Sequence, residues 1–385
     1  MSGTEPPASS SPIPARRLSR RQLLSSGAKL AVGIPTAAWL AACSNAGEAG
    51  GSTSTSTPSG TAPAELSGTM VFDNYAGWIG ESEVANFESL HPGVKIKEIS
   101  GVTGSPAASV QQIKNDPNLY DMSLHDQAFV SQATLIGDII QEPDLSRIPN
   151  IANVQQQFRD AFPYGIPTDL GKTGIAYRKD IVTEGITSWA DLWALAPKYS
   201  GQIVFFNFDN TVLGSALKYL GYSGNSHDQG ELDQAKQALI DIKPHLQGLI
   251  DYGVGTRLVK GTAAIGMDYD ADVALAQQRE PNIEWVFPEE GLMAYIEGWI
   301  AVKDSPQLDI VWEFMNFHLD PVNYADFVNT TYTAYVEDGP GIKPEIANNP
   351  ILAFDPATAD KIDYEAFKGD AAPAWAMAWD EFKSA

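Results

Sequence analysis

The sequence predicts an α/β protein built from two domains. After a basic and apolar leader, 319 residues remain from Ser67 to Ala385, which is more than one ordinary core holds. Short apolar strands alternate with helical patterns along this body, which favours parallel sheets flanked by helices. Each predicted strand ends in a loop of acidic and aromatic residues, and ligands bind such sheets at the carboxyl ends of strands.

The leader, residues 1–42, has the composition of an export signal. Four arginines precede a weakly apolar stretch that ends in small residues. The segment Ser19-Arg20-Arg21-Gln22-Leu23-Leu24 resembles the twin-arginine signal, and export by the Sec route stays open. From Leu30 to Ala42 there are 13 residues, interrupted by Pro35, against the ~20 that a bilayer span requires. We therefore expect a cleaved signal peptide rather than a transmembrane anchor.

The leader ends in Leu40-Ala41-Ala42-Cys43, which resembles the bacterial lipobox. Cleavage before the Cys of a lipobox leaves a thiol for lipid attachment, so we expect a mature protein anchored to a membrane through Cys43. It would face the periplasm or the extracellular side. Cys43 is the only Cys, which excludes an intramolecular disulfide. Residues 43–66 are mostly Ser, Thr, Gly, Ala and Pro, which predicts a flexible tether with a reach of about 25 Å.

The chain is strongly acidic. Its net charge is −23, and removing residues 1–42, with five basic side chains and one acidic, leaves −27. This argues against nucleic acid as a partner, because nucleic-acid sites cluster Lys and Arg. Long-range attraction would favour cationic ligands. Solubility of an exported protein explains the same charge.

The first elements of the body form a β–α–β unit. Met70–Phe72 is a short apolar strand. A helix follows, indicated by the spacing of Val84 and Phe87, and Pro92-Gly93 ends it. Val94–Ile99 then alternates as a strand.

The same alternation recurs farther along the chain and predicts a second sheet. Gln202–Phe206 is a buried strand, and Val212–Tyr219 is the helix after it. Ala263–Met267 and Glu284–Phe287 are further strands that end in acidic and aromatic loops.

Aromatic rings and carboxylates with almost no Lys or Arg gather at these strand ends. A ring face within about 6 Å of a cation contributes ~0.5–2 kcal/mol, and a desolvated carboxylate adds a charge-assisted hydrogen bond. The set therefore suits an ammonium ligand, although each residue alone also fits a packed ring or a solvated loop. The candidates are Tyr75, Trp78, Asp126, Asn207, Asp209, Tyr269, Tyr295 and Glu297.

Three motifs resemble the spermidine/putrescine-binding proteins of bacterial ABC importers. They are Thr187-Ser188-Trp189-Ala190-Asp191-Leu192-Trp193, Leu220-Gly221-Tyr222-Ser223-Gly224-Asn225 and Phe287-Pro288-Glu289-Glu290-Gly291, in this order. The resemblance covers nearly all of the body. It implies a two-lobed periplasmic-binding-protein fold of type II, in which each lobe is a mixed, mainly parallel sheet flanked by helices. The ligand would bind in the cleft between the lobes.

The resemblance also implies the domain boundaries. The chain would cross between the lobes more than once, so that each lobe is discontinuous. Lobe one would comprise residues 67–170 with 297–341, and lobe two residues 171–296 with 342–385.

Residue by residue, the aromatic pair of the family falls on Tyr75 and Trp78, and its second-lobe platform falls on Tyr269 and Tyr295. The central carboxylate that grips an amine falls on Glu297, where the family has Asp.

Two further positions of the family lie toward the C-terminus. A polar position, usually Gln, falls on Glu365, which would offer a second anion. A Tyr of the family falls around Tyr332 or Thr333.

The chain also departs from the family. Two acidic positions of spermidine binders fall on Phe208 and Thr211, although Asp209 can stand in for one of them. An aromatic position falls on Ala128. A shorter diamine or a different organic cation therefore stays open as the ligand.

The resemblance implies a binding component and not an enzyme. Two lobes would close on a small organic cation, and the closed form would dock on an ABC permease driven by its ATPase. We expect a monomer without cofactor or metal. One alternative keeps the fold but binds an anion, for which Gly101–Pro106 can open a helix, or a sugar. The other is a secreted hydrolase with Glu289 and Glu290 as paired carboxylates.

Overall fold

The computed structural model describes residues 65–99, 106–136, 139–336 and 339–385. The chain separates into residues 1–61 and a compact unit of residues 62–385. The predicted leader, Cys43 and nearly all of the predicted tether lie outside the described residues, as do residues 101–105 of the alternative anion site.

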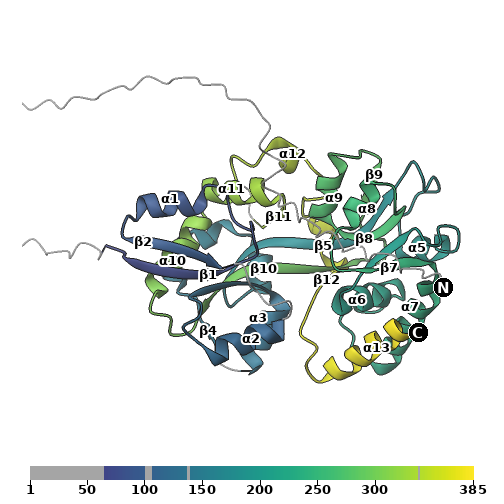
Figure 1. The fold of residues 1–385 in the computed structure, drawn as a ribbon, viewed down its shortest axis with the longest axis horizontal. Coiled ribbons are helices and arrows are strands. Elements are labelled where there is room, and N and C mark those ends of the chain that lie inside the picture. Colours follow the sequence, from purple (N-terminus) through teal and green to yellow (C-terminus); the bar gives the residue numbers. More distant parts are fainter. Residues whose placement is uncertain (1–64, 100–105, 137–138, 337–338) are drawn as a thin grey trace, which may run out of the picture. The chain divides into compact units, whose positions relative to one another are not determined.

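Among the described residues of the compact unit, twelve strands form one hydrogen-bonded sheet (Figure 1). Its main path runs β2-β1-β3-β10-β5-β8-β6-β7, with β4 and β12 paired to β10 and with β9 and β11 paired to β5. The strands are β1 (Gly68–Asp73), β2 (Val94–Ile99), β3 (Met122–Asp126), β4 (Ile140–Gln141), β5 (Ile166–Arg178), β6 (Ile203–Phe206), β7 (Leu246–Ile250), β8 (Ile265–Tyr269), β9 (Ile283–Val286), β10 (Leu292–Val302), β11 (Ala334–Tyr335) and β12 (Ile362–Tyr364).

Two long strands, β5 with 13 residues and β10 with 11, run antiparallel through the middle of this sheet. Figure 1 shows β1 and β2 at one end of the pair and β7 and β8 at the other. In the strand order, β3 lies between β1 and β10, and β6 lies between β8 and β7. The outer strands pair in parallel, as the β–α–β pattern predicts, whereas β5 is antiparallel to all its partners. The expectation of a second, separate sheet is wrong, because β5 and β10 hydrogen-bond both ends into one.

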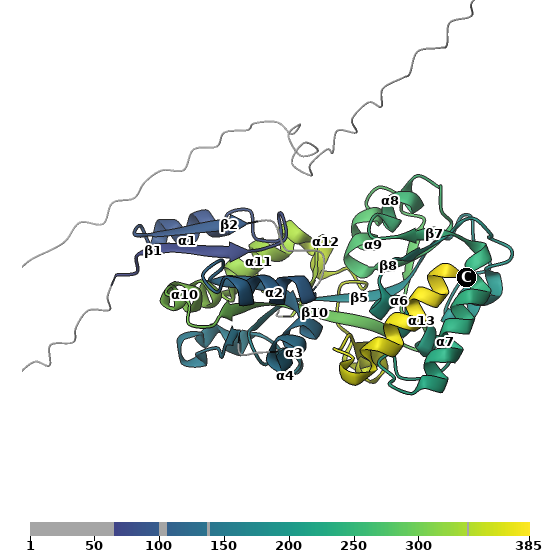
Figure 2. The ribbon, with the colours of Figure 1, turned by 60° about the horizontal axis from the view of Figure 1, so that its bottom comes forward.

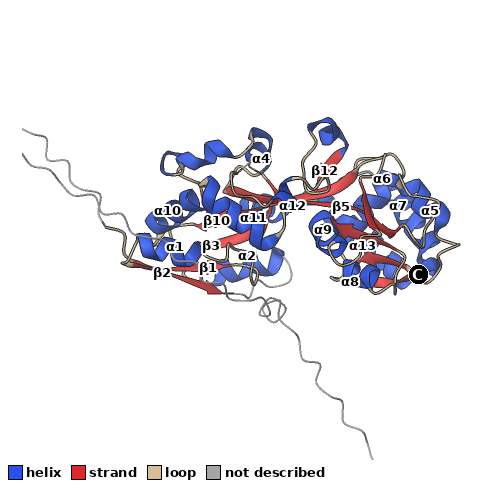
Figure 3. Ribbon diagram, turned by 90° about the horizontal axis from the view of Figure 1, so that it is seen from above, coloured by secondary structure: helices blue, strands red, loops and turns tan. Residues whose placement is uncertain are grey.

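Helices flank the strands at both ends of the sheet (Figure 3). Figure 2 shows the C-terminal helix α13 lying along α6 and α7. The helices are α1 (Glu83–Leu90), α2 (Pro106–Asn115), α3 (Gln127–Ile136), α4 (Gln156–Ala161), α5 (Trp189–Leu195), α6 (Asp209–Tyr219), α7 (Gln229–Ile242), α8 (Val254–Val259), α9 (Asp270–Gln277), α10 (Leu308–His318), α11 (Pro321–Thr331), α12 (Pro344–Ala347) and α13 (Ala372–Ser384). Short 3-10 helices cover Leu145–Arg147, Pro149–Asn153, Lys243–His245, Pro356–Lys361 and Gly369–Ala371.

Buried apolar side chains form two core clusters. One holds Phe72, Trp299 and Phe314, with the Trp299 and Phe314 rings stacked at 5.4 Å. The other holds Trp189 and Phe205 with the C-terminal helix. β5 contributes Leu170 to the first cluster and Ile175 to the second, so this strand passes from one core to the other. The lobe boundaries proposed from the sequence stay a prediction.

Candidate functional site

Three carboxylates form one row across three neighbouring strands. Glu297 on β10 lies opposite Asp126 on β3 and opposite Asp169 on β5, and both pairings are antiparallel. Residues directly opposite each other in antiparallel strands project to the same face of the sheet. We call Asp126, Glu297 and Asp169 the carboxylate row.

A β-bulge brings Asp169 into this row. The pairing of β5 with β10 shifts between Glu297 and Gly298, so that Glu297 pairs with Asp169 while Gly298 pairs with Pro167. Thr168 is the extra residue, and its hydroxyl donates to Asp169 Oδ1 at 2.9 Å and to the Glu297 carbonyl at 3.3 Å. Without the bulge the register would place Thr168 opposite Glu297 and turn Asp169 to the other face.

Burial and like charge act together on Glu297, which is only 9% exposed. Burial raises its pKa well above the ordinary value, and the charges of Asp169 and Asp126 raise it further. A hydrogen bond with Trp78 lowers it, so the groups that shift this pKa are two carboxylates and an indole. Burial also raises the pKa of Asp126, and that of Asp169 to about 6. The carboxyl groups of the row therefore favour their protonated forms more than isolated carboxyl groups do, and no basic side chain is among the groups that shift the pKa of Glu297.

The loop after β1 brings two aromatic residues to the row. The Trp78 indole Nε1 donates to Asp169 Oδ1 at 3.3 Å, and its ring meets Phe327 edge-on at 6.3 Å. The Asn74 side chain fixes the loop by donating to the Trp78 carbonyl at 3.0 Å. Tyr75 is 40% exposed. Desolvation by the surrounding protein and the nearby charges of Glu297 and Asp126 nevertheless raise its pKa. It thus faces solvent within reach of the carboxylate row.

A second pair of rings lies beside Glu297. Tyr295 stands two residues before Glu297 on β10 and therefore projects to the same face. Its ring meets that of Tyr269, at the end of β8, at 5.3 Å and 90°. Gly171 on β5 lies opposite Tyr295, and a Cβ there would overlap the Tyr295 ring. The glycine leaves the room in which this ring lies against the strand.

The rings continue away from the row through residues that the sequence analysis did not place in the site. Phe206 stacks on Tyr269 at 4.6 Å, and Phe208 lies 5.7 Å from both Phe206 and Tyr252. Tyr252 is 76% exposed. Desolvation by the surrounding protein and the charge of Glu297 nevertheless raise its pKa. The signal that identifies Tyr252 is its position two residues after the end of β7, in an acidic and aromatic loop like the one that pointed to Tyr269.

Glu365 provides an acidic group apart from the row. Its backbone N–H donates to the Ala294 carbonyl at 2.7 Å, so it lies beside β10, and its carboxylate accepts a hydrogen bond from Thr211 at 2.5 Å. Burial raises its pKa to about 7, Thr211 lowers it, and the charge of Asp126 raises it again. The Gln127 amide donates to the Glu365 carbonyl at 2.8 Å and accepts from the N–H of Ile296 at 2.6 Å, which joins this segment to the middle of β10.

Asp209 begins α6 near Glu365 and lines a pocket of about 160 Å³ together with Lys368 and Trp375. The Lys368 ammonium lies 3.9 Å from the centre of the Trp375 ring, and burial lowers its pKa to about 8. This end of the site therefore already holds a cation, unlike the carboxylate row.

Comparison with known proteins identifies the family. The model for bacterial extracellular solute-binding proteins matches residues 83–359, which is more than half of the chain. This chain belongs to the bacterial extracellular solute-binding proteins.

Curated relatives of this solute-binding protein align over most of their length. The spermidine/putrescine-binding periplasmic protein of Escherichia coli is 25% identical over 333 residues, 84% of this chain and 94% of the relative. The putrescine/cadaverine-binding protein of Pseudomonas aeruginosa is 24% identical over 322 residues, 79% and 90% of the two chains. Among solved structures, the spermidine/putrescine ABC transporter substrate-binding protein PotD of Streptococcus pneumoniae has a TM-score of 0.73 at 22% identity, covering 83% and 99%. The predicted two-lobed α/β fold class is confirmed.

The motifs that carried the resemblance hold the solute-binding protein together rather than line its carboxylate row. The Glu290 carboxylate accepts from the backbone N–H groups of Trp189 and Ala190, both at 3.0 Å, and the Trp189 indole donates to the Gly291 carbonyl at 2.8 Å. The middle motif is tied to β12, since the Asn225 amide donates to the Tyr364 carbonyl at 2.8 Å. Glu290 thus binds the start of α5, so Glu289 and Glu290 do not form the free pair of carboxylates that the hydrolase alternative requires.

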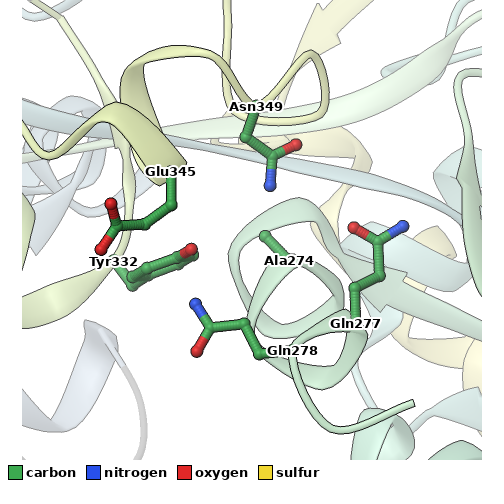
Figure 4. A pocket seen from close by; sticks show the side chains of 6 residues that line it. All are labelled: Ala274, Gln277, Gln278, Tyr332, Glu345 and Asn349. Atoms are coloured by element: carbon green, nitrogen blue, oxygen red, sulfur yellow. The ribbon is translucent and has the colours of Figure 1, made fainter. Parts of the chain in front are cut away.

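Of the two positions on which a family Tyr falls, Thr333 reaches the row. Its hydroxyl donates to Asp169 Oδ2 at 3.3 Å. Tyr332, in a left-handed conformation at the end of α11, lines a separate cavity of about 470 Å³. Figure 4 shows Tyr332 beside Glu345 and across from Gln278. Asn207 donates to the exposed Asp251 at 3.0 Å rather than to the row.

The described ranges contain neither a metal-binding cluster nor a membrane-spanning helix. No group of three or more His, Cys, Asp or Glu side chains is arranged to hold a metal ion. No helix in these ranges has the length and apolar character that crossing a membrane requires.

Proposed function

We propose that this solute-binding protein captures a small organic cation, a putrescine- or spermidine-like polyamine, and delivers it to an ABC permease with its ATPase. The observation that carries the proposal is the carboxylate row. Its three acidic side chains share one face of the sheet, and no basic side chain is among the groups that shift the pKa of Glu297. A cationic ligand would supply the missing positive charge.

The rings beside the row support an amine over other cations of the same charge. Tyr75, Trp78, Tyr269 and Tyr295 would meet ammonium groups with their faces and methylene groups with their apolar surface. Desolvated carboxylate–ammonium hydrogen bonds are short and strong, and a primary ammonium has three N–H donors with which to make them. The two relatives described above are named for the ligands that they bind, spermidine with putrescine and putrescine with cadaverine, which are amines of this kind.

The second acidic end, Glu365 with Asp209, would take another ammonium group of the same ligand. Lys368 lowers the pKa of Glu365 by its charge and so partly neutralises this end before any ligand arrives. We therefore place the stronger ammonium contact at Glu297 and the weaker one at Glu365.

Capture would proceed by a shift between open and closed arrangements of the two lobes. Asp169, Tyr295 and Glu297 all lie on the strands that join the two ends of the sheet. A ligand shifts such an equilibrium only as far as it binds the closed state more tightly. No bond is made or broken in this cycle, so the proposal contains no catalytic step.

We place the protein on the outer side of a membrane, held by lipid on Cys43 through the 43–66 tether, and acting as a monomer. The tether would keep the binding unit at a high local concentration beside the permease. Replacing Cys43 by Ser should release the protein from the membrane and impair uptake while ligand affinity in solution is unchanged. Retention of Cys43→Ser in the membrane fraction would contradict the lipid anchor.

Calorimetric titration of the purified protein tests the ligand class. The panel is putrescine, spermidine, a quaternary ammonium such as betaine, phosphate and maltose. Saturable heat with a primary amine, and none with phosphate or maltose, is the expected result. A response to phosphate or maltose without a response to any amine would overturn the proposal.

A further inference from the structure

We propose that ligand capture releases a proton from the carboxylate row, and that Asp169 is the positioning residue responsible for this linkage. The inference rests on the proposed capture of a cation and adds to it a change in protonation that the resemblance does not imply.

Asp169 lies beneath Trp78 and out of reach of solvent. Its side chain is 0% exposed. One carboxylate oxygen accepts from the Trp78 indole at 3.3 Å and from the Thr168 hydroxyl, and the other accepts from the Thr333 hydroxyl at 3.3 Å. All three donors are neutral, so their hydrogen bonds leave the negative charge of Asp169 in place. Asp169 therefore acts on a ligand through Trp78 and through Glu297, its partner across the strands.

The three carboxylates of the row are too close together to be charged independently of one another. They lie on three adjacent strands, and neighbouring strands are about 4.8 Å apart. Carboxylates that share a buried site do not all ionise together, because each charge raises the pKa of the others. Burial raises the pKa of Glu297 well above its ordinary range and the pKa of Asp169 to about 6. The unliganded row therefore holds a proton up to a higher pH than isolated carboxyl groups do.

The groups around the row offer no positive charge that would replace this proton. Lys172 follows Asp169 by three residues on β5 and projects to the opposite face. There its Nζ donates to the carbonyls of Ile351 and Ala353 and lies 3.4 Å from the Asp270 carboxylate, with which it forms an ion pair. His125 projects away from Glu297, and burial lowers its pKa to about 3, which keeps it neutral. The remaining titratable groups that act on the row are acids and phenols: Asp126, Asp270, Glu365, Tyr75, Tyr252, Tyr269 and Tyr295.

A cation that binds beside Glu297 would supply the charge that the proton supplied before. The amine arrives already protonated, so the carboxylic acid loses its proton to the solvent and becomes the anion that the ammonium contacts. One charge enters the site with the ligand and one leaves with the proton. Lowering the pH then favours the protonated row and weakens binding.

Calorimetric titration of the purified protein with putrescine at pH 7, in buffers of different ionisation enthalpy such as PIPES and Tris, counts the released protons. We expect release of roughly half a proton to one proton per ligand, and a Kd that rises by up to about tenfold for each pH unit between pH 7 and pH 5. Equal heats in both buffers with a Kd independent of pH would overturn the proton linkage, while capture itself would stand. Absence of heat with every amine would instead overturn the proposed function.

Asp169→Asn separates charge from hydrogen bonding, because the amide oxygen still accepts from Trp78. We expect it to release at most half as many protons as the unaltered protein and to flatten the pH dependence of Kd. Asp241→Asn, which removes one carboxylate from the exposed side of α7, is the matched control and should change neither. Proton release that is unchanged in a folded Asp169→Asn variant would remove Asp169 from this role.

Trp78→Phe provides a second test that does not alter a carboxylate. Loss of the indole donor should raise the pKa of Asp169 and Glu297, and so move the pH at which putrescine binding weakens to a higher value. An unchanged midpoint would contradict the proposed link between Trp78, Asp169 and proton release.

Discussion

Glu297 is the residue on which the proposed capture depends most, because in the row it alone lies opposite carboxylates on both neighbouring strands. Glu297→Gln keeps the shape of the side chain but removes its charge. We expect it to weaken putrescine binding at least tenfold, about 1.4 kcal/mol, as measured by calorimetry. Glu289→Gln, an exposed position, is the matched control and should bind normally. Equal affinities of the two variants would exclude Glu297 as the central group.

Gly171 makes room for the ring beside Glu297. Because a Cβ at position 171 would overlap the Tyr295 ring, Gly171→Ala should displace Tyr295 and weaken amine binding several-fold. Gly230→Ala on α7 is a suitable control, since its Cβ would meet only the Asp228 carboxylate, at 3.1 Å. Titration of both variants with putrescine gives the comparison, and full affinity in Gly171→Ala would show that the Tyr295 position does not matter.

At the scale of single residues, the sequence pointed to much of the site but not to Asp169. Glu297, Trp78 and Tyr295 stood at recognisable positions of a family pattern. The place of Asp169 in the row depends on the bulge at Thr168, because the bulge changes the face of the sheet to which Asp169 projects. The spacing of apolar residues in the sequence does not reveal this bulge. The sequence left Tyr332 and Thr333 as alternatives for one position of the family, and only the contact with Asp169 shows that Thr333 is the one that reaches the row.

At the scale of elements, Lys172 joins β5 to two other segments. Its Nζ lies 3.4 Å from Asp270 at the start of α9, and it donates to the carbonyls of Ile351 and Ala353 at 2.7 and 2.8 Å. Both partners of the ion pair are almost completely buried. Lys172 therefore fixes the crossing strand against the segment through which the chain continues to β12.

Lys172→Met should lower the free energy of unfolding by roughly 3–5 kcal/mol, because it leaves the Asp270 carboxylate buried without its partner. The double variant Lys172→Met with Asp270→Asn should recover part of the loss. Lys198→Met breaks an ion pair with Glu184 whose side chains are 58% and 36% exposed, and it should cost far less. Chemical denaturation of the variants measures these differences, and equal losses in the two single variants would contradict the buried role.

The elements with local signals were predictable from the sequence, and those with distant partners were not. The β1–α1–β2 unit, α6 and β8 follow apolar spacing and end at recognisable residues such as Pro92-Gly93. The pairing of β5 with β10 joins segments more than a hundred residues apart in the sequence, and no local pattern in either segment identifies the other as its partner. This pairing joined what the sequence suggested as two sheets.

At the scale of the molecule, buried acids make the stability of the unliganded protein depend on pH. Burial raises the pKa of Asp73, Asp169 and Asp270 to about 6 and that of Glu365 to about 7. A carboxyl in the unfolded chain has a pKa of about 4, so the folded state binds more protons than the unfolded state between these values. Stability should therefore rise as the pH falls through this window.

We expect the melting temperature of the unliganded protein to rise by about 2 °C between pH 8 and pH 6.5. Below about pH 6.5 the buried, neutral His125 opposes this trend, because the unfolded His binds a proton and the folded one does not until about pH 3. Calorimetric scans across this range provide the measurement. A melting temperature that falls from pH 8 to pH 6.5 would show that these carboxyls ionise freely in the fold.

The acidic charge of the whole chain, −23, gains a specific meaning from the row. General acidity of an exported protein predicts only weak attraction of any cation, which salt screens. A buried row flanked by rings predicts selection of one kind of cation at one place, and it predicts that binding depends on charge and not on chain length alone.

Comparing putrescine with 1,4-butanediol shows whether recognition depends on charge, because the two share a four-carbon chain and differ in having ammonium or hydroxyl groups at the ends. We expect saturable binding of putrescine and no measurable binding of the diol at the same concentrations in calorimetric titration. Comparable dissociation constants for the two compounds would contradict charge recognition by Glu297 and its neighbours.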